Sequence, residues 1–173
     1  MAAALAIAAV PASAKNPMVG GAAMYPTKNI VQNAVNSKDH TTLVAAVKAA
    51  GLVDTLASKG PFTVFAPTNA AFGKLPAGTV ETLIKPENKG TLTTVLTYHV
   101  VPGRFTAGQI ASLAARSKGV ATLKTVQGEK LKFRKRGSGW VVTDSKGGNS
   151  RITIANVMQS NGVIHVVDTV LMP

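Results

Sequence analysis

Residues 60–72 read Gly-Pro-Phe-Thr-Val-Phe-Ala-Pro-Thr-Asn-Ala-Ala-Phe and predict a strand that leads into a helix. After the Gly-Pro turn, the run of β-branched and aromatic residues favours a strand. Pro67 ends that strand, and Thr68 or the residue after it caps a helical turn. A strand that leads directly into a helix forms a corner, and we expect Phe65 and Phe72 to be buried there.

Two shorter motifs follow this corner. Residues 98–103 read Tyr-His-Val-Val-Pro-Gly and close a stripe of apolar residues at helical spacing, and residues 161–168 read Asn-Gly-Val-Ile-His-Val-Val-Asp. Alternate residues of a strand face opposite sides, so the second motif is apolar on both faces and predicts a central, buried strand. His165 and Asp168 then need hydrogen-bond partners inside the protein.

In this order and at these separations, the three motifs resemble the two homology blocks and the Tyr-His box of fasciclin (FAS1) domains. The resemblance covers roughly residues 28–173. It implies an α+β fold in which a β-sheet wedge or sandwich packs against several helices. It also implies a secreted or cell-surface adhesion and interaction module that is not an enzyme. The block residues that carry the family's structural motif are Phe65, Pro67, Thr68, Phe72, Asn161, Gly162, His165 and Asp168.

The order of helical and strand patterns independently indicates an α+β fold. Short helices are expected between residues 30 and 99, with Ser37 and Asp39 as candidate caps. Beyond Arg104 the hydrophobic period changes from 3.6 to 2, and strands are expected at residues 122–126, 130–136, 140–143, 151–154 and 163–167. The second and third of these should pair as a hairpin. Helices and strands that are segregated along the chain are typical of α+β domains.

The chain length and its first residues suggest one exported domain. The 173 residues suffice for a single core, and the absence of cysteine excludes disulfides and thiolate metal sites. Residues 1–14 read as a signal peptide that ends in an Ala-x-Ala cleavage site. No Lys or Arg precedes its apolar run, so we expect the start to be truncated or placed too late. A flexible lead-in over residues 15–27 and the FAS1 domain over residues 28–173 should follow.

No second long apolar run exists in the sequence. We therefore expect no transmembrane segment, and a secreted protein that resides in the periplasm or at the cell surface.

Positive charge is concentrated in the second half of the chain. The net charge is +12, and residues 104–151 hold 11 of the 19 Lys and Arg but only two of the seven acids. Within the expected hairpin, alternation places Lys130, Lys132, Arg134 and Arg136 on one strand face. Such a row favours a polyanionic partner. The alternative interpretation is a solvated outer face whose lysines deter edge-to-edge pairing of strands.

Tyr98 and His99 are the second candidate binding group. In fasciclin adhesion proteins the Tyr-His region is implicated in receptor contact, so the resemblance implies a pair that faces a ligand. The alternative is a structural pair that ties a helix end to the sheet. An apolar patch near Tyr98 could also support self-association. Asp168 is a possible charge partner for a histidine.

The sequence contains no motif of a known catalytic site. It lacks the G-x-S-x-G and H-E-x-x-H patterns, and its three histidines lack metal-ligand spacing. We therefore expect no enzymatic activity, no metal and no cofactor. The expected partner is a cell-surface protein or an anionic glycan, and not nucleic acid, because aromatic residues for base stacking are scarce. The protein is expected to be a monomer or a weak homo-oligomer.

Overall fold

The computed structural model describes residues 18–58, 60–75, 78–137 and 139–172. The predicted signal peptide lies outside these residues. Strands β1 (Met18–Val19) and β2 (Ala22–Ala23) form a small antiparallel hairpin within the segment expected to be a flexible lead-in. Val19 and Met24 are buried in the core. The packed part of the described chain therefore begins before residue 28.

Short helices make up most of the first half of the domain, as the sequence predicts. They are α1 (Ile30–Ala34), the 3-10 helix η1 (Lys38–His40), α2 (Thr41–Ala49), α3 (Val53–Ala57), α4 (Asn69–Gly73), α5 (Thr79–Leu83), the 3-10 helix η2 (Pro86–Asn88) and α6 (Lys89–Tyr98). The expected cap at Thr68 is present, because its hydroxyl accepts a hydrogen bond from the Ala71 amide at 3.1 Å. Ser37 makes no capping bond and instead contacts the His40 ring.

A seven-stranded sheet forms the second layer of the fold. Its strands are β3 (Phe62–Pro67), β4 (Val100–Pro102), β5 (Val120–Lys124), β6 (Lys130–Arg136), β7 (Gly139–Thr143), β8 (Asn149–Gln159) and β9 (Gly162–Val167). They lie in the order β4-β3-β9-β8-β7-β6-β5, and only β3 and β9 are parallel neighbours. The predicted hairpin of β6 and β7 is confirmed.

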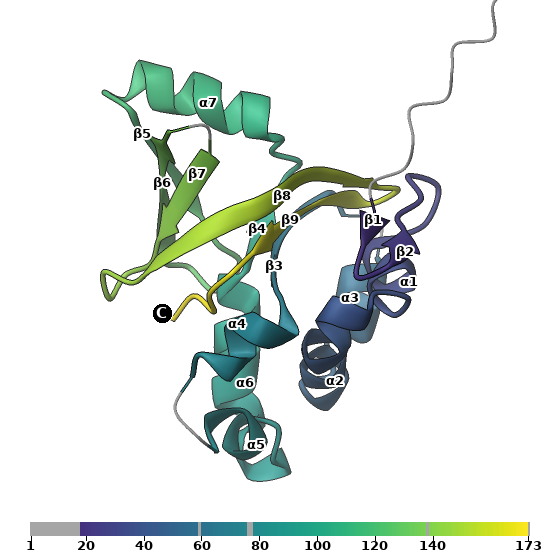
Figure 1. Cartoon of the computed structure of the whole chain (residues 1–173). Coiled ribbons are helices and arrows are strands. Elements are labelled where there is room, and N and C mark those ends of the chain that lie inside the picture. Colours follow the sequence, from purple (N-terminus) through teal and green to yellow (C-terminus); the bar gives the residue numbers. More distant parts are fainter. Residues whose placement is uncertain (1–17, 59, 76–77, 138, 173) are drawn as a thin grey trace, which may run out of the picture.

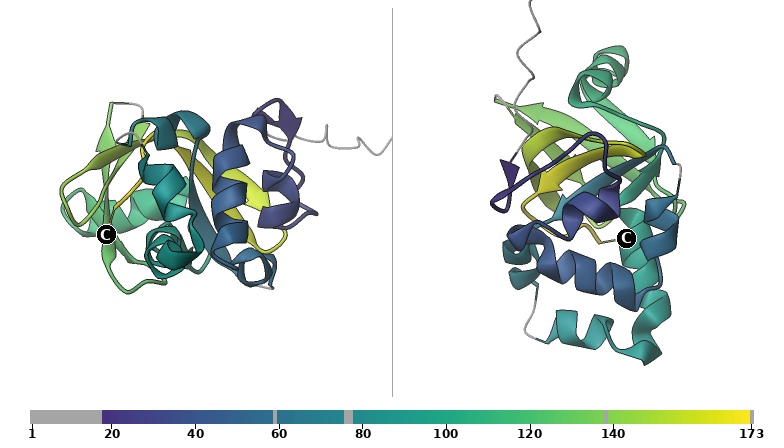
Figure 2. Two further views of the ribbon diagram at one scale, coloured as in Figure 1. Left: turned by 90° about the horizontal axis from the view of Figure 1, so that it is seen from below. Right: turned by 90° about the vertical axis from the view of Figure 1, so that its right-hand side faces the viewer.

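The sheet curls so strongly that its first and last strands approach each other. The Val126 amide, just after β5, donates to the Val100 carbonyl of β4 at 2.8 Å. Helices α1 to α6 lie on one side of the sheet, whereas α7 (Ala107–Arg116) stands apart over β5 and β6 (Figures 1 and 2). The result is an α+β fold with a nearly barrel-like sheet.

Strands β3 and β9 form a wall between two apolar cores. Val64 and Ile164 face a core that the helices α1, α2, α3, α4 and α6 complete. Phe65 and Val167 face a second core inside the curled sheet, which α7 covers with Ile110. Every residue of β9 is buried, as expected for a strand that is apolar on both faces.

Three elements differ from the sequence-based expectations. Helix α7 lies in a stretch that was expected to have strand periodicity, and strand β4 was not predicted. A capping box starts α7, because Thr106 and Gln109 each bond the backbone of the other. Strand β8 is longer than expected, and it bends at Asn156, which takes a left-handed conformation (φ 58°) at a register shift.

Asn161 fastens the helices to the wall. Its side-chain oxygen accepts a hydrogen bond from the Ile30 amide at 3.0 Å. Its side-chain nitrogen donates to the Leu56 carbonyl at 2.6 Å and to the Ser58 carbonyl at 2.7 Å. The following residue must be glycine, because a Cβ on Gly162 would overlap the backbone carbonyl of β3. One buried amide thus joins α1, α3 and the start of β9.

Two buried histidines provide further cross-links. His99 Nδ1 donates to the Val95 carbonyl at 2.8 Å, and its Nε2 accepts from the Leu171 amide at 2.9 Å. Burial lowers the pKa of His99 from 6.5 to about 4, against smaller opposing effects of the Val95 carbonyl and the Asp144 charge. In His165 the two ring nitrogens exchange these roles: Nε2 donates to the Phe105 carbonyl, and Nδ1 accepts from the Asn156 amide. Burial also lowers the pKa of His165.

Replacing Asn161 with alanine should destabilise the protein strongly. Asn161→Ala removes all three bonds and leaves one backbone amide and two carbonyls without their partner. We expect the free energy of unfolding to fall by about 3 kcal/mol, measured by urea denaturation. The matched control is Asn36→Ala, which removes one exposed bond to the Gln32 carbonyl and should change stability by less than about 0.5 kcal/mol. Equal effects of the two substitutions would contradict the cross-linking role of Asn161.

The buried His99 should make the protein sensitive to mild acid. Between pH 6.5 and pH 4 the unfolded chain binds a proton at this site and the folded chain does not, so stability must fall as the pH falls. At pH 4 the loss from His99 amounts to about 3 kcal/mol. Urea denaturation at several pH values measures it, and a His99→Gln variant should lose less stability over the same range. The same pH dependence in both proteins would show that His99 is not responsible.

Candidate functional site

The row of basic side chains predicted on strand β6 lies on an exposed face of the sheet. Lys130, Lys132, Arg134 and Arg136 are exposed, whereas Leu131 and Phe133 between them are completely buried. The alternation follows from strand geometry, because one face of β6 covers the inner core. The four charges therefore project to the same side.

Pairing with the neighbouring strands adds two cations that the sequence analysis did not select. Lys124 of β5 lies directly opposite Lys130. Arg151 of β8 lies opposite Val141, which itself lies opposite Arg134. The Arg151 guanidinium reaches over Gly139, since a Cβ there would lie 3.7 Å from its Nε. These two cations and the four of β6 make up what we call the basic face: Lys124, Lys130, Lys132, Arg134, Arg136 and Arg151.

The cations of the basic face have no acidic partner in the part of the chain that the structure describes. Among the described residues, none of them forms a salt bridge, and the ion pair that is present joins Lys74 to Asp168. Glu129 is exposed just before β6 and is the nearest acid in the sequence. Like charges opposite one another on adjacent strands repel, as Lys124 and Lys130 do. The fold therefore maintains a repulsive arrangement that an anionic ligand would relieve.

Tyr98 supports the basic face from within the core. Its side chain is completely buried. The Tyr98 hydroxyl donates to the Lys130 carbonyl at 3.2 Å and accepts from the Ser145 amide at 2.9 Å. Burial raises the pKa of Tyr98, so the hydroxyl keeps its proton. Tyr98 thereby holds the first residue of β6 and the turn between β7 and β8.

His99 is also buried, at 2% exposure. The two residues of the Tyr-His pair point to different elements, because His99 bonds the C-terminal segment at Leu171 and Tyr98 bonds β6 and the β7–β8 turn. A ligand could contact either ring only if that ring moved out of the core. The burial of both side chains favours the structural interpretation of this pair.

The remaining motif residues lie mostly on or beside the wall, away from the basic face. Phe65, Pro67, Phe72, Asn161, Gly162 and His165 are buried, and Thr68 is half-buried. The Phe65 ring stacks on the His165 ring with centroids 5.6 Å apart. These contacts account for the motif residues as parts of the fold.

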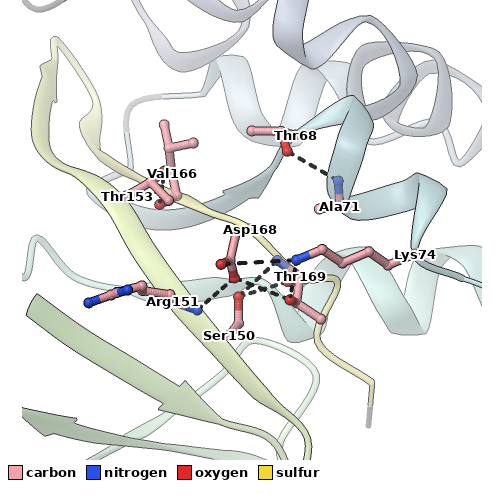
Figure 3. A network of polar contacts seen from close by, with 9 residues as sticks. All are labelled: Thr68, Ala71, Lys74, Ser150, Arg151, Thr153, Val166, Asp168 and Thr169. Atoms are coloured by element: carbon pink, nitrogen blue, oxygen red, sulfur yellow. Dashed lines mark hydrogen bonds and ion pairs between the residues drawn. The ribbon is translucent and has the colours of Figure 1, made fainter. Parts of the chain in front are cut away.

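Asp168 lies at the surface end of β9, where it connects two elements (Figure 3). One carboxylate oxygen accepts from the Arg151 amide at 2.8 Å and from the Thr169 hydroxyl at 3.1 Å. The other lies 4.0 Å from Lys74 Nζ. The suggestion that Asp168 is the charge partner of a histidine is therefore wrong. Its partners hold β8 at Arg151, a member of the basic face.

A search for other kinds of site gives little. Within the described ranges, no group of three or more His, Asp or Glu side chains is arranged to hold a metal ion. None of the helices described there is both long and apolar enough to cross a membrane. The basic face is therefore the candidate interface of the described residues.

Comparison with known proteins identifies relatives of the chain. The family described as the Fasciclin domain matches residues 38–173. The chain is 46% identical over 171 residues to the protein sll1483 of Synechocystis, and this alignment covers 98% of the chain and 87% of the relative. It is 36% identical over 191 residues to the immunogenic protein MPB70 of Mycobacterium bovis, and this alignment covers 99% of the chain and 90% of the relative.

A solved structure shows the same fold. It is a FAS1 domain pair from the insect cell adhesion molecule Fasciclin I, which superposes with a TM-score of 0.74 at 18% identity. The match covers 84% of this chain and 51% of the insect chain. Motifs, fold and the family match agree, and this chain belongs to the fasciclin domain family.

Proposed function

We propose that this protein is an exported, non-enzymatic adhesion module that binds an anionic cell-surface glycan through its basic face. The proposal rests on the six cations of strands β5, β6 and β8, which β7 joins into one surface and which form no ion pair with any described residue. The relation to an insect cell adhesion molecule and to a mycobacterial immunogenic protein supports an extracellular role. Residence in the periplasm or at the cell surface fits both.

The spacing of the charges suits a polymer with regularly repeated anions. Side chains on one face of a strand recur about every 6.6 Å, and neighbouring strands lie about 4.8 Å apart. The row from Lys130 to Arg136 is therefore about 20 Å long, and Lys124 and Arg151 widen it on either side. Arginine can also form paired hydrogen bonds with carboxylate, sulfate or phosphate groups.

The rigidity of the support favours binding. Strand β6 lies between β5 and β7, and its buried side chains fill the inner core. Tyr98 fixes the backbone at Lys130. A surface that is already ordered loses less conformational entropy when it binds, so even individually weak charge contacts can add up. Six such contacts along one polymer would give useful affinity together.

Other partner classes have less support. An exported protein would rarely meet nucleic acid, and the basic face contains no aromatic side chain on which a base could stack. Self-association near Tyr98 gains no support, because that side chain is buried. A protein partner with an acidic surface would use the same cations, and the experiment below separates it from a glycan.

Neutralising two cations at the centre of the basic face should weaken glycan binding. We expect the double variant Lys132→Gln/Arg134→Gln to bind sodium alginate, a polyuronate, about fivefold to tenfold more weakly than the wild type at low salt. Isothermal titration calorimetry measures the affinity. Uncharged dextran, used as the neutral comparison, should not bind to either protein.

The matched control neutralises two exposed lysines on the helical side. Lys85→Gln/Lys89→Gln changes the net charge by the same amount but should alter alginate affinity by less than about twofold. Equal losses in the two double variants would show that net charge, and not the basic face, determines binding. Absence of alginate binding in the wild type would refute a polyuronate ligand and favour an acidic protein partner.

A further inference from the structure

An apolar cavity of about 50 Å³ lies on the opposite side of the wall from the inner core. Helices α1, α2 and α3 border it on one side, and strands β3, β4 and β9 border it on the other. Its lining includes Met24, Leu43, Val47, Leu56, Val64 and Leu96. The exposed Lys48 also borders the cavity, so one end of it lies near the surface. Apolar cavities of this kind stay free of water and can take up small apolar molecules.

The lining also includes the polar side chains Ser37, His40, Lys48 and His99, and among the described residues only His40 has a buried side-chain atom without a partner. His40 is 3% exposed, and its Nε2 has no hydrogen-bond partner among the described residues. Its other ring nitrogen, Nδ1, lies 2.8 Å from the hydroxyl oxygen of Ser37, which is also buried. A buried polar atom without a partner is destabilising, and such atoms are rare in native proteins. His40 thus places a buried polar atom without a partner at the edge of the cavity.

The hydrogen-bonding pattern identifies Nε2 as a donor. Burial lowers the pKa of His40, so the ring is neutral and carries one proton. If that proton were on Nδ1, the Ser37 hydroxyl oxygen would accept a hydrogen bond from it. The hydroxyl hydrogen of Ser37 would then have no acceptor. If the Ser37 hydroxyl donates to Nδ1, both of these groups are satisfied and the proton lies on Nε2. The Ala66 carbonyl is near enough to His40 to oppose part of the lowering of its pKa, but it does not have the geometry of a hydrogen bond to Nε2.

We propose that this cavity binds a small apolar molecule, or the end of a longer one, that carries a hydrogen-bond-accepting oxygen such as a carbonyl. The oxygen accepts the proton of His40 Nε2, and the hydrocarbon part contacts the aliphatic lining. This site is separate from the basic face and does not depend on the glycan-binding role. It adds a second ligand class to an interaction module.

A pair of isosteric probes tests the proposal. 2-Butanone has a carbonyl where 2-methyl-1-butene has a methylene group, so the two differ in the hydrogen bond and hardly in shape. Each is titrated into the wild-type protein, and NMR follows the methyl groups of the lining and the His40 ring. We expect both probes to shift the methyl signals, and only the ketone to shift the His40 Nε2 signal.

The His40→Leu variant should bind the ketone about fivefold more weakly and the alkene at least as well as the wild type. Retained alkene binding also shows that this variant keeps its fold and its cavity. Equal ketone affinity in both proteins would overturn the role of His40. If the methyl signals of the lining in the wild-type protein do not respond to either probe, the cavity is not a binding site.

A cavity-filling variant separates this site from nonspecific binding. Ala34 borders the cavity, and Ala34→Leu should abolish the binding of both probes. The matched control is Ala45→Leu, which adds the same side chain on the exposed side of α2 and should leave both affinities unchanged. Binding that survives in Ala34→Leu would overturn the assignment of the site to this cavity.

Discussion

The parallel pairing of β3 with β9 is the contact on which the rest of the structure depends. The two strands pair along their whole length, from Phe62 opposite Gly162 to Pro67 opposite Val167. Because their side chains alternate, they supply one wall to two separate cores. The close approach of the two backbones requires Gly162, and Asn161 beside it holds the helices in place. The two cores of the domain therefore pack against opposite faces of this one pair of strands.

The two cores have different consequences for function. Leu131 and Phe133 complete the inner core. Because side chains alternate along a strand, the residues of β6 between and beside them project to the outer surface. The charges of the basic face are therefore positioned by apolar packing and by the Tyr98 hydroxyl, and not by ion pairs. The helical core packs less completely at one point, where the cavity and His40 meet. The described part of the chain thus combines a charged outer surface with an apolar cavity, two sites of different chemistry.

Much of this architecture could be predicted from local sequence patterns. The central position of β9 follows from its apolar residues on both faces, and the exposed row on β6 follows from the alternation of charged and apolar residues over residues 130–134. Helix α7 was missed although Ile110, Leu113 and Ala114 form an apolar stripe at helical spacing and the Thr106–Gln109 capping box marks its start. Lys124 and Arg151 could not be assigned to the basic face, because strand register is set by tertiary pairing. The partners of Tyr98 lie 32 and 47 residues away, beyond any local pattern.

The proposed function requires that fixed surface charge, presented by a rigid sheet, attracts a polyanion. The salt dependence of alginate binding by the wild-type protein tests it most directly, because counterions released on binding make affinity fall with salt concentration. The account predicts that affinity falls more than about tenfold between roughly 50 and 200 mM sodium chloride. Affinity that stays constant over this range would contradict the account and place the interaction on uncharged parts of the surface.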